Sequence, residues 1–389
     1  MTRVRRWTGL RLPSVLAALV SVAVVTACGS SGYESAGPFR PKPEGAPPEV
    51  GPPSETAPAP APGEPAEPGA GDEDAGDPNV VASGLTVPTG LVVLPDGTAV
   101  VGERESGRLL QVFPDRSPAK VLMTVPGVDA GGDGGLLGLA LSPTYQEDGL
   151  LYAYLSTATD NRVVRFPVGG TPNAVFTGIP RGEVHNGGGL LFGADGTLFV
   201  GTGDTGDARL AGDPTSLAGK VLRIDVFGHR IGNRPYFTRG HRDVTALCSG
   251  GEDALFATDD AQEGPDELDA LAEGGDYGAS APVGGDPVVE IPGEEGGLGG
   301  CAVAGSSVFL GALDGERVHV VTLDGRGAPT GDPEELLDGR YGRLRTTVLD
   351  TQGGLWITTS NKDGVGDPAE DDDKVLRILP PSAQGGSPL

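Results

Sequence analysis

The stretch Leu190-Leu-Phe-Gly-Ala-Asp-Gly-Thr-Leu-Phe-Val200 decides the fold of this chain. Two apolar runs flank an Asp-Gly turn, which is a typical signal of a β-hairpin. A third run, Lys220-Val-Leu-Arg-Ile224, follows as a strand with a basic residue at its start. Outward from this unit, the same order of apolar strand, turn, second strand and basic-apolar strand returns along the chain.

Five further copies of this pattern are present, of which the fourth along the chain is the weakest. They begin at Gly90, Gly138, Val244, Ala302 and Leu344, and the last ends in Lys374-Val-Leu-Arg-Ile378. Repeats of roughly 45–55 residues that each make four strands are typical of propeller blades, because one blade cannot bury both of its faces alone. The sequence therefore predicts an all-β fold, a six-bladed β-propeller of four-stranded antiparallel blades. A β-sandwich pair is the alternative, but it does not predict so regular a return.

Residues 1–27 have the features of an export signal. Four arginines precede an apolar run from Leu16 to Val25, which is short for a membrane span. The run ends in Val25-Thr-Ala-Cys28, which resembles the lipobox of bacterial lipoproteins. An ordinary secretion signal with a stray Cys is the alternative. We expect lipidation of Cys28 and attachment to the extracytoplasmic face of the cell membrane, where two or more acyl chains give stable anchoring.

The lipobox is followed by a segment that is rich in Pro, Gly, Ala and Glu. It covers residues 28–79 and lacks the apolar periodicity that could offset chain entropy, so we expect a disordered tether, either a stalk or a passive tail. The propeller is expected over residues 80–381, followed by a disordered tail over 382–389.

The charge balance and the cysteines limit the partners and the compartment. The chain has 54 acidic and 28 basic residues, which argues against nucleic acid as a partner. Three cysteines occur, and Cys248 and Cys301 remain if Cys28 is lipidated. Because an exported chain meets an oxidising environment, a disulfide between these two is expected, with two buried free thiols as the alternative.

Several motifs resemble the soluble PQQ-dependent glucose/sorbosone dehydrogenase family, and they occur in the family's order. They are Asp133-Gly-Gly-Leu-Leu-Gly-Leu-Ala-Leu-Ser-Pro, His185-Asn-Gly-Gly-Gly-Leu, Gly201-Thr-Gly-Asp, Gly240-His-Arg-Asp, Asp266-Glu-Leu-Asp with Gly275-Asp-Tyr-Gly, and Tyr341-Gly-Arg-Leu-Arg. The stretch from Asp133 to Arg165 is especially similar to the LppZ-type lipoproteins of actinobacteria. The resemblance implies oxidation of a sugar at C1, with PQQ as the hydride acceptor and an unidentified electron acceptor.

The resemblance implies a catalytic pair. The general base would be His185, because imidazole titrates near neutrality, and Asp204 would orient it. The hairpin turn at Asp195-Gly196 brings the two flanking strands side by side, so this pairing is geometrically reasonable. A loop His that caps a turn and an Asp in a turn are the alternative.

The resemblance also implies a binding site for cofactor and substrate. PQQ carries three carboxylates, which guanidinium groups match in bidentate geometry, and Arg343 and Arg345 lie two apart on a strand, where they share a face. Further positions match the family at Arg242 for the cofactor, Asp133 for the sugar, and Asp266 and Glu267 for a Ca²⁺ ion. An exposed strand face or a surface turn is the alternative for these residues.

Five residues at four sites depart from the family pattern. Asp243 stands where the family has Asn, Asp314 where it has a Lys that pairs with PQQ, Ala261-Gln262 where it has a Gly-Pro that binds Ca²⁺, and Gly189 where it has Arg. New acids near a tri-carboxylate cofactor should weaken its binding. The alternative function is therefore a non-catalytic propeller that binds a glycan or an envelope protein. A hydrolase with metal-bound water is a third possibility, but four His in the whole chain form no recognisable ligand spacing.

Overall fold

The computed structural model describes residues 76–251, 254–261, 264–278 and 285–380. The expected signal peptide, Cys28, the tether up to residue 75, Gln262 and the tail over 382–389 lie outside the described residues. Within the described part of the chain, no helix is long and apolar enough to cross a membrane.

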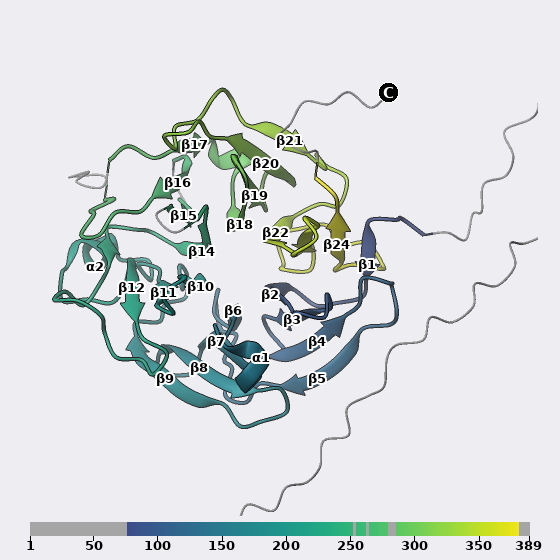
Figure 1. Cartoon of the computed structure of the whole chain (residues 1–389), viewed down its shortest axis with the longest axis horizontal. Helices are drawn as coiled ribbons and strands as arrows, with labels where there is room; N and C mark the ends of the chain where they lie inside the picture. Colours follow the sequence, from purple (N-terminus) through teal and green to yellow (C-terminus); the bar gives the residue numbers. More distant parts are fainter. Residues whose placement is uncertain (1–75, 252–253, 262–263, 279–284, 381–389) are drawn as a thin grey trace, which may run out of the picture. The chain divides into compact units, whose positions relative to one another are not determined.

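The described chain forms six four-stranded sheets, and every pair of neighbouring strands within them is antiparallel. Figure 1 shows the sheets as blades around a ring, with the first strand of each blade nearest the centre. The predicted six-bladed propeller is therefore confirmed, and the alternative of a β-sandwich pair is wrong.

The first three blades cover the chain up to Arg239. Blade 1 contains β2 (Pro88–Val93), β3 (Ala99–Glu103), β4 (Arg108–Val112) and β5 (Lys120–Thr124). Blade 2 contains β6 (Leu136–Leu141), β7 (Leu150–Ser156), β8 (Asn161–Pro167) and β9 (Asn173–Ile179). Blade 3 contains β10 (Leu190–Phe192), β11 (Leu198–Gly201), β12 (Lys220–Ile224) and β13 (Thr238–Arg239).

The last three blades complete the ring. Blade 4 contains β14 (Val244–Ser249), β15 (Leu255–Asp259), β16 (Asp266–Ala270) and β17 (Val289–Ile291). Blade 5 contains β18 (Leu298–Ala304), β19 (Ser307–Ala312), β20 (Arg317–Thr322) and β21 (Glu334–Leu336). Blade 6 contains β22 (Leu344–Leu349), β23 (Leu355–Thr359), β24 (Val375–Ile378) and β1 (Val80–Ala82).

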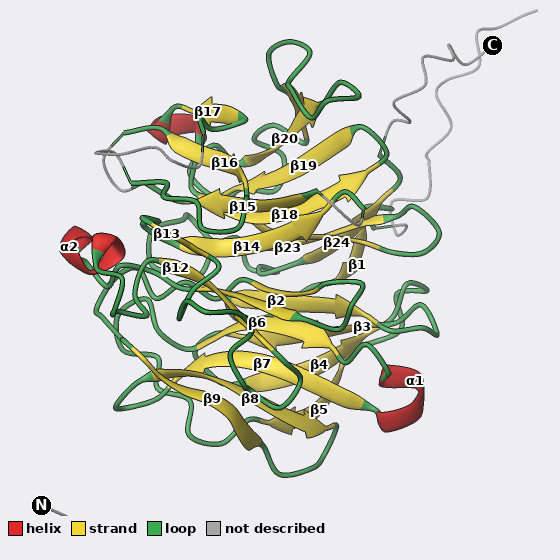
Figure 2. Ribbon diagram, turned by 60° about the vertical axis from the view of Figure 1, so that its left-hand side comes forward, coloured by secondary structure: helices red, strands yellow, loops and turns green. Residues whose placement is uncertain are grey.

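The ring closes between the two ends of the folded chain. β1 pairs with β24, with Val80 opposite Leu376, so the first strand in sequence becomes the outer strand of the last blade. The helical elements are short and lie in the connections, as Figure 2 shows. They are α1 (Tyr145–Asp148), α2 (Ala208–Gly212) and a 3₁₀ turn (Gly293–Glu295).

The hydrophobic core is divided among the junctions between blades. Six clusters of buried side chains are present, and each spans one pair of neighbouring blades, for example Trp356 of blade 6 with Leu91 of blade 1. This arrangement is the physical reason for the repeat, because each blade buries its two faces only against its neighbours. A disulfide also joins Cys248 on β14 to Cys301 on β18, with their Cα atoms 5.7 Å apart, and so links blades 4 and 5.

Candidate active site

The predicted site residues converge because of where they stand in the blades. In an antiparallel blade, the segment before the first strand and the loop between the second and third strands lie at the same edge. His185 and Asp133 precede the first strands of blades 3 and 2, while Asp204 and Asp314 follow the second strands of blades 3 and 5. The topology therefore gathers residues from distant parts of the chain at one face of the propeller.

His185 is held by its backbone. Its φ of 53° is in the left-handed region, which non-glycine residues rarely adopt. The His185 carbonyl accepts a hydrogen bond from the Thr205 amide at 3.1 Å. A side chain at Gly203 would collide with this same carbonyl, so the close approach of the two loops requires glycine there. The loop geometry thereby fixes the direction of the imidazole.

His185 and Asp204 form a buried pair. The Nδ1–H of His185 donates to Asp204 Oδ1 at 2.7 Å, and the residues are 8% and 2% exposed. Asp204 Oδ1 also accepts from the Gly206 amide at 2.8 Å, which fixes the carboxylate. Within the described chain His185 Nε2 has no hydrogen-bond partner, so this nitrogen is the one available to a ligand.

The surroundings of His185 make its imidazole more basic. The hydrogen bond to Asp204 raises the pKa of His185, and the negative charges of Asp243 and Asp204 act in the same direction. Burial and the positive charge of Arg242 oppose the rise in pKa. The net effect is a His that binds its proton more tightly than a free imidazole does.

A cavity of about 170 Å³ lies beside this pair and is bounded by charged side chains. Its charged lining residues are Arg104, Asp133, Asp243, Asp260, Arg343, Arg345 and Asp363. The structure thus brings the predicted Arg343, Arg345 and Asp133 into one cavity. Three of the lining residues, Arg104, Asp260 and Asp363, were missed from the sequence, although each follows the second strand of its blade as Asp204 does.

The two predicted strand arginines differ in their contacts. Arg343 donates from Nη1 to Asp314 Oδ1 at 2.6 Å and from Nε to Asp363 Oδ2 at 2.8 Å. Arg345 makes neither an ion pair nor a hydrogen bond with any described residue, and burial together with the nearby Arg104 lowers its pKa. Arg343 is therefore neutralised by direct ion pairs, whereas Arg345 has only the longer-range attraction of Asp363, Asp243 and Asp260.

Two of the acids that line this cavity are only partly exposed to water. Asp243 accepts from the Gly187 amide at 2.7 Å, and burial raises its pKa to about 7. Burial also raises the pKa of Asp260 well above its ordinary value. Protonation would reduce the negative charge that these acids present to an anionic ligand.

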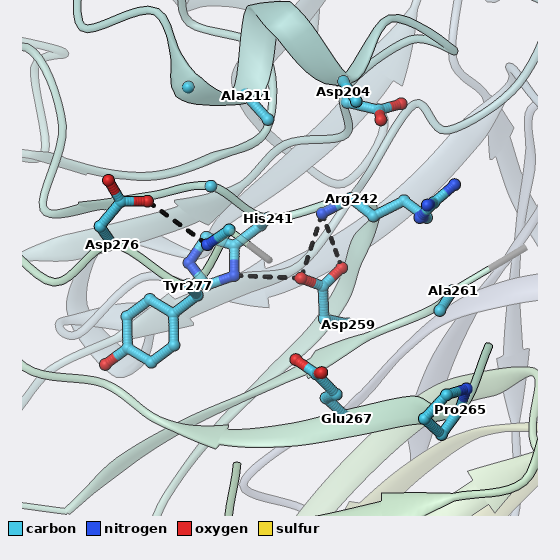
Figure 3. Close-up of a pocket in the computed structure, with 14 residues that line it drawn as sticks. Asp204, Ala211, His241, Arg242, Asp259, Ala261, Pro265, Glu267, Asp276 and Tyr277 are labelled. Carbon is cyan, nitrogen blue, oxygen red and sulfur yellow. Dashed lines mark hydrogen bonds and ion pairs between the residues drawn. The ribbon is translucent and has the colours of Figure 1, made fainter. Parts of the chain in front are cut away.

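Arg242 faces a second pocket, of about 400 Å³, which Figure 3 shows. Asp204 lines the same pocket, so the His185–Asp204 pair adjoins it. The Arg242 side chain extends away from His241, and its amide donates to Asp259 Oδ1 at 2.9 Å. The third predicted arginine is therefore close to the pair but outside the cavity that holds Arg343 and Arg345.

The structure does not bring Asp266 and Glu267 together on one ion. They are consecutive residues of β16, so their side chains point to opposite faces of the strand. Asp266 accepts from the amides of Ala261, Gly297 and Leu298 at 2.7, 2.6 and 3.1 Å. Its carboxylate anchors these loops, whereas Glu267 lines the pocket of Figure 3. The two carboxylates therefore do not converge on one point in the described chain, and ligation of Ca²⁺ by Asp266 and Glu267 stays a prediction.

A six-bladed propeller with a buried His–Asp pair beside an arginine-lined cavity defines the class of this protein, and comparisons agree. Residues 85–286 match the family model for Glucose / Sorbosone dehydrogenase. The PQQ-bound aldose sugar dehydrogenase of Streptomyces coelicolor is 40% identical in sequence, with a TM-score of 0.73 over 77% of this chain and 95% of that chain. The chain belongs to the glucose/sorbosone dehydrogenase family.

Two curated relatives are more distant. Quinoprotein glucose dehydrogenase B of Acinetobacter calcoaceticus is 26% identical over 249 residues, which are 52% of this chain and 52% of that protein. Aldose sugar dehydrogenase YliI of Escherichia coli is 24% identical over 336 residues, which are 73% of this chain and 90% of that protein. The match thus spans about half the length of the first relative and most of the second.

Proposed function

We propose that this protein is a PQQ-dependent aldose dehydrogenase that is attached to the outer face of the cell membrane through Cys28. The His185–Asp204 hydrogen bond of 2.7 Å is the observation that carries this proposal, because it gives the site an oriented base. Membership of the glucose/sorbosone dehydrogenase family and the similarity to a PQQ-bound aldose sugar dehydrogenase support it.

The residues of the cavity fit a cofactor that carries carboxylates. Arg345 makes no direct ion pair with a described residue, so its guanidinium is available to a carboxylate of a ligand, although Asp243, Asp260 and Asp363 line the same cavity. Arg345 would hold one carboxylate of PQQ, with Arg343 in the same cavity and Arg242 in the second pocket together with Asp204. When bound, PQQ would supply the acceptor for the hydride that leaves the sugar.

The chain's own residues would handle the proton and the substrate. His185 Nε2 would take the proton of the C1 hydroxyl, while Asp204 keeps the imidazole in one tautomer and stabilises its charged form. Asp133 lines the same cavity and would accept a hydrogen bond from a sugar hydroxyl. The arrangement of Asp266 does not fit a Ca²⁺ ligand. Both of its carboxylate oxygens already accept hydrogen bonds from backbone amides.

A second candidate function is a propeller that binds a glycan or an envelope protein without catalysis. The ion pairs of Arg343 with Asp314 and Asp363 favour it, because they occupy a guanidinium that the resemblance assigns to the cofactor. Asp314 stands where the family has a Lys, and its negative charge beside Arg343 acts in the same direction.

A PQQ titration tests the first function against the second. The purified protein is titrated with PQQ in the presence of Ca²⁺ while the cofactor's absorbance is followed, and dye reduction is then measured with a panel of aldoses. Saturable binding with turnover of at least one aldose supports the dehydrogenase. Absence of binding at micromolar PQQ would leave the binding propeller. Binding without turnover would show that the cavity accepts the cofactor but that the proposed chemistry is wrong.

A further inference from the structure

A second cluster of ionisable side chains lies in blade 4, apart from the His185–Asp204 pair. His241 precedes β14, Asp259 ends β15 and Asp269 belongs to β16, so neighbouring segments of one blade bring them together. The three residues are 0%, 7% and 1% exposed. Neither the proposed oxidation nor the predicted cofactor contacts use this cluster.

The spacing of the cluster is that of ligands around an ion. His241 Nδ1 lies 3.3 Å from Asp259 Oδ2 and 3.6 Å from Asp269 Oδ2, and one ligand atom from each residue lies within 4.8 Å of the others. A separation of 3.6 Å is too long for a hydrogen bond. Two ligands bound at about 2.1 Å to a tetrahedral ion are separated by roughly 3.4 Å.

Asp269 gives independent evidence for a bound cation. Its Oδ2 is buried and has no hydrogen-bond partner among the described residues. A buried carboxylate oxygen without a partner is destabilising, and such groups in native proteins are rare. Because this oxygen belongs to the cluster and faces His241, a cation between them would satisfy it.

The other contacts of the cluster orient its atoms. His241 Nε2 bonds to Thr238 Oγ1 at 2.8 Å, which leaves Nδ1 directed at the two carboxylates. Asp259 is fixed by the amides of Arg242 and Asp243, which donate to its Oδ1 at 2.9 and 2.7 Å. Such outer contacts are typical of metal-binding imidazoles and carboxylates. His241 and Asp259 also line the pocket of Figure 3, which provides an entry path and room for a further ligand.

We propose that His241 Nδ1, Asp259 Oδ2 and Asp269 Oδ2 form a binding site for one divalent transition-metal ion, with Zn²⁺ as the best match. One imidazole nitrogen and two carboxylate oxygens suit Zn²⁺ in three-ligand sites that keep an open position. The ion would take the place of the proton on His241 Nδ1, which now contacts only Asp259 within hydrogen-bond distance, and it would hold β14, β15 and β16 together beside Arg242.

Metal titrations of the purified protein, prepared without a histidine tag and stripped with a chelator, test this site. Calorimetry should show one Zn²⁺ per chain, and Co²⁺ should give the visible absorption of a site with low coordination number. Asp269→Asn keeps the size of the side chain but removes its charge, and it should weaken Zn²⁺ binding at least tenfold. Asp276→Asn, at the wall of the same pocket but outside the cluster, should leave the affinity unchanged.

The outcomes that would overturn the site do not depend on enzymatic turnover. A wild-type protein without saturable Zn²⁺ binding and without a Co²⁺ spectrum contradicts the proposal even if Asp269→Asn fails to fold. Equal Zn²⁺ affinity of the wild type and a folded Asp269→Asn, checked by circular dichroism, contradicts it as well. Since neither measurement uses PQQ or a sugar, failure of the dehydrogenase function would leave these results unaffected.

Discussion

The His185–Asp204 pair and the arginine-lined wall of the cavity follow the family pattern to different degrees. The pair arises from loops of one blade and has the geometry of an oriented base, with a separation of 2.7 Å. The wall, formed by Arg343 and Arg345 with Asp314 and Asp363, comes from blades 5 and 6. Asp314 and Asp363 form ion pairs with Arg343, while Arg345 forms no ion pair with a described residue. The His185–Asp204 pair has the contact that the resemblance implies, whereas Arg343 is paired with acids that the resemblance does not imply. These departures should therefore affect cofactor affinity more than catalysis.

The largest expected effect is on the catalytic pair. His185→Ala removes the proposed base, and we expect the turnover of a PQQ-loaded protein to fall about 10²- to 10⁴-fold. PQQ affinity should change little, since the arginines remain. Dye reduction with saturating PQQ and aldose measures the first quantity, and the absorbance titration measures the second.

The matched control for this variant is His229→Ala. His229 is an exposed residue that also pairs with an aspartate, Asp225, at 2.9 Å. Its loss should leave both turnover and cofactor affinity at wild-type values. Turnover by His185→Ala within a few-fold of the wild type would show that the base is another group and that the pair has only a structural role.

The free guanidinium of the wall should have the next largest effect. Arg345→Gln removes a charge that forms no ion pair with a described residue. We expect the Kd for PQQ to rise roughly 10- to 100-fold, because a hydrogen bond to a charged group contributes about 1.5–3 kcal/mol. Arg326→Gln, on an exposed turn, is the control for the lost charge. An unchanged Kd for Arg345→Gln would mean that the cofactor, if it binds, does not contact this wall.

The propeller could be predicted from the sequence because its cause is local and repeated. Each blade is a run of short strands with Asp-Gly or Gly-Gly turns, such as the turn at Asp195-Gly196 between β10 and β11. Six returns of such a unit leave few ways to bury the faces of the sheets. The closure of the ring by β1 beside β24 was not predicted, because it depends on pairing between the two ends of the folded region.

The contacts of the site were less predictable than its fold. The His185–Asp204 contact could be anticipated because one hairpin separates the two residues. The roles of Asp260 and Asp363 depend on blades that are distant in sequence, and no motif distinguishes them from other loop acids. The separation of the Asp266 and Glu267 side chains has a local cause, because the alternation of β16 sends consecutive carboxylates to opposite faces.

Reversal of the charge at Asp314 should have a smaller effect on PQQ affinity, in the direction of tighter binding. Asp314→Lys frees Arg343 from one of its two partners and restores the sign of the family residue, so PQQ should bind up to about tenfold more tightly. The half-exposed position of Asp314 limits the gain, because solvent screens its charge. Asp332→Lys makes the same charge change at an exposed loop position and should have no comparable effect. Weaker PQQ binding by Asp314→Lys would show that the Asp314–Arg343 pair itself orients the wall.

The smallest expected effect is a shift in the pH dependence of kcat/KM. Because the hydrogen bond to Asp204 raises the pKa of His185, the neutral base should become half-populated above the pH that is usual for imidazole, and kcat/KM should rise with pH through that point. Stability should respond in the opposite sense: the contribution of the pair is complete below the pKa of the unfolded imidazole and is lost as pH rises through the folded pKa. Asp204→Asn should move the midpoint of the residual kcat/KM profile to lower pH and reduce the loss of stability over the same range, because it removes the hydrogen bond that raises the pKa of His185. Asp225→Asn changes the exposed His–Asp pair instead and should leave the kcat/KM profile in place. A midpoint that does not move in Asp204→Asn would assign the ionisation to a group of the wall rather than to the pair.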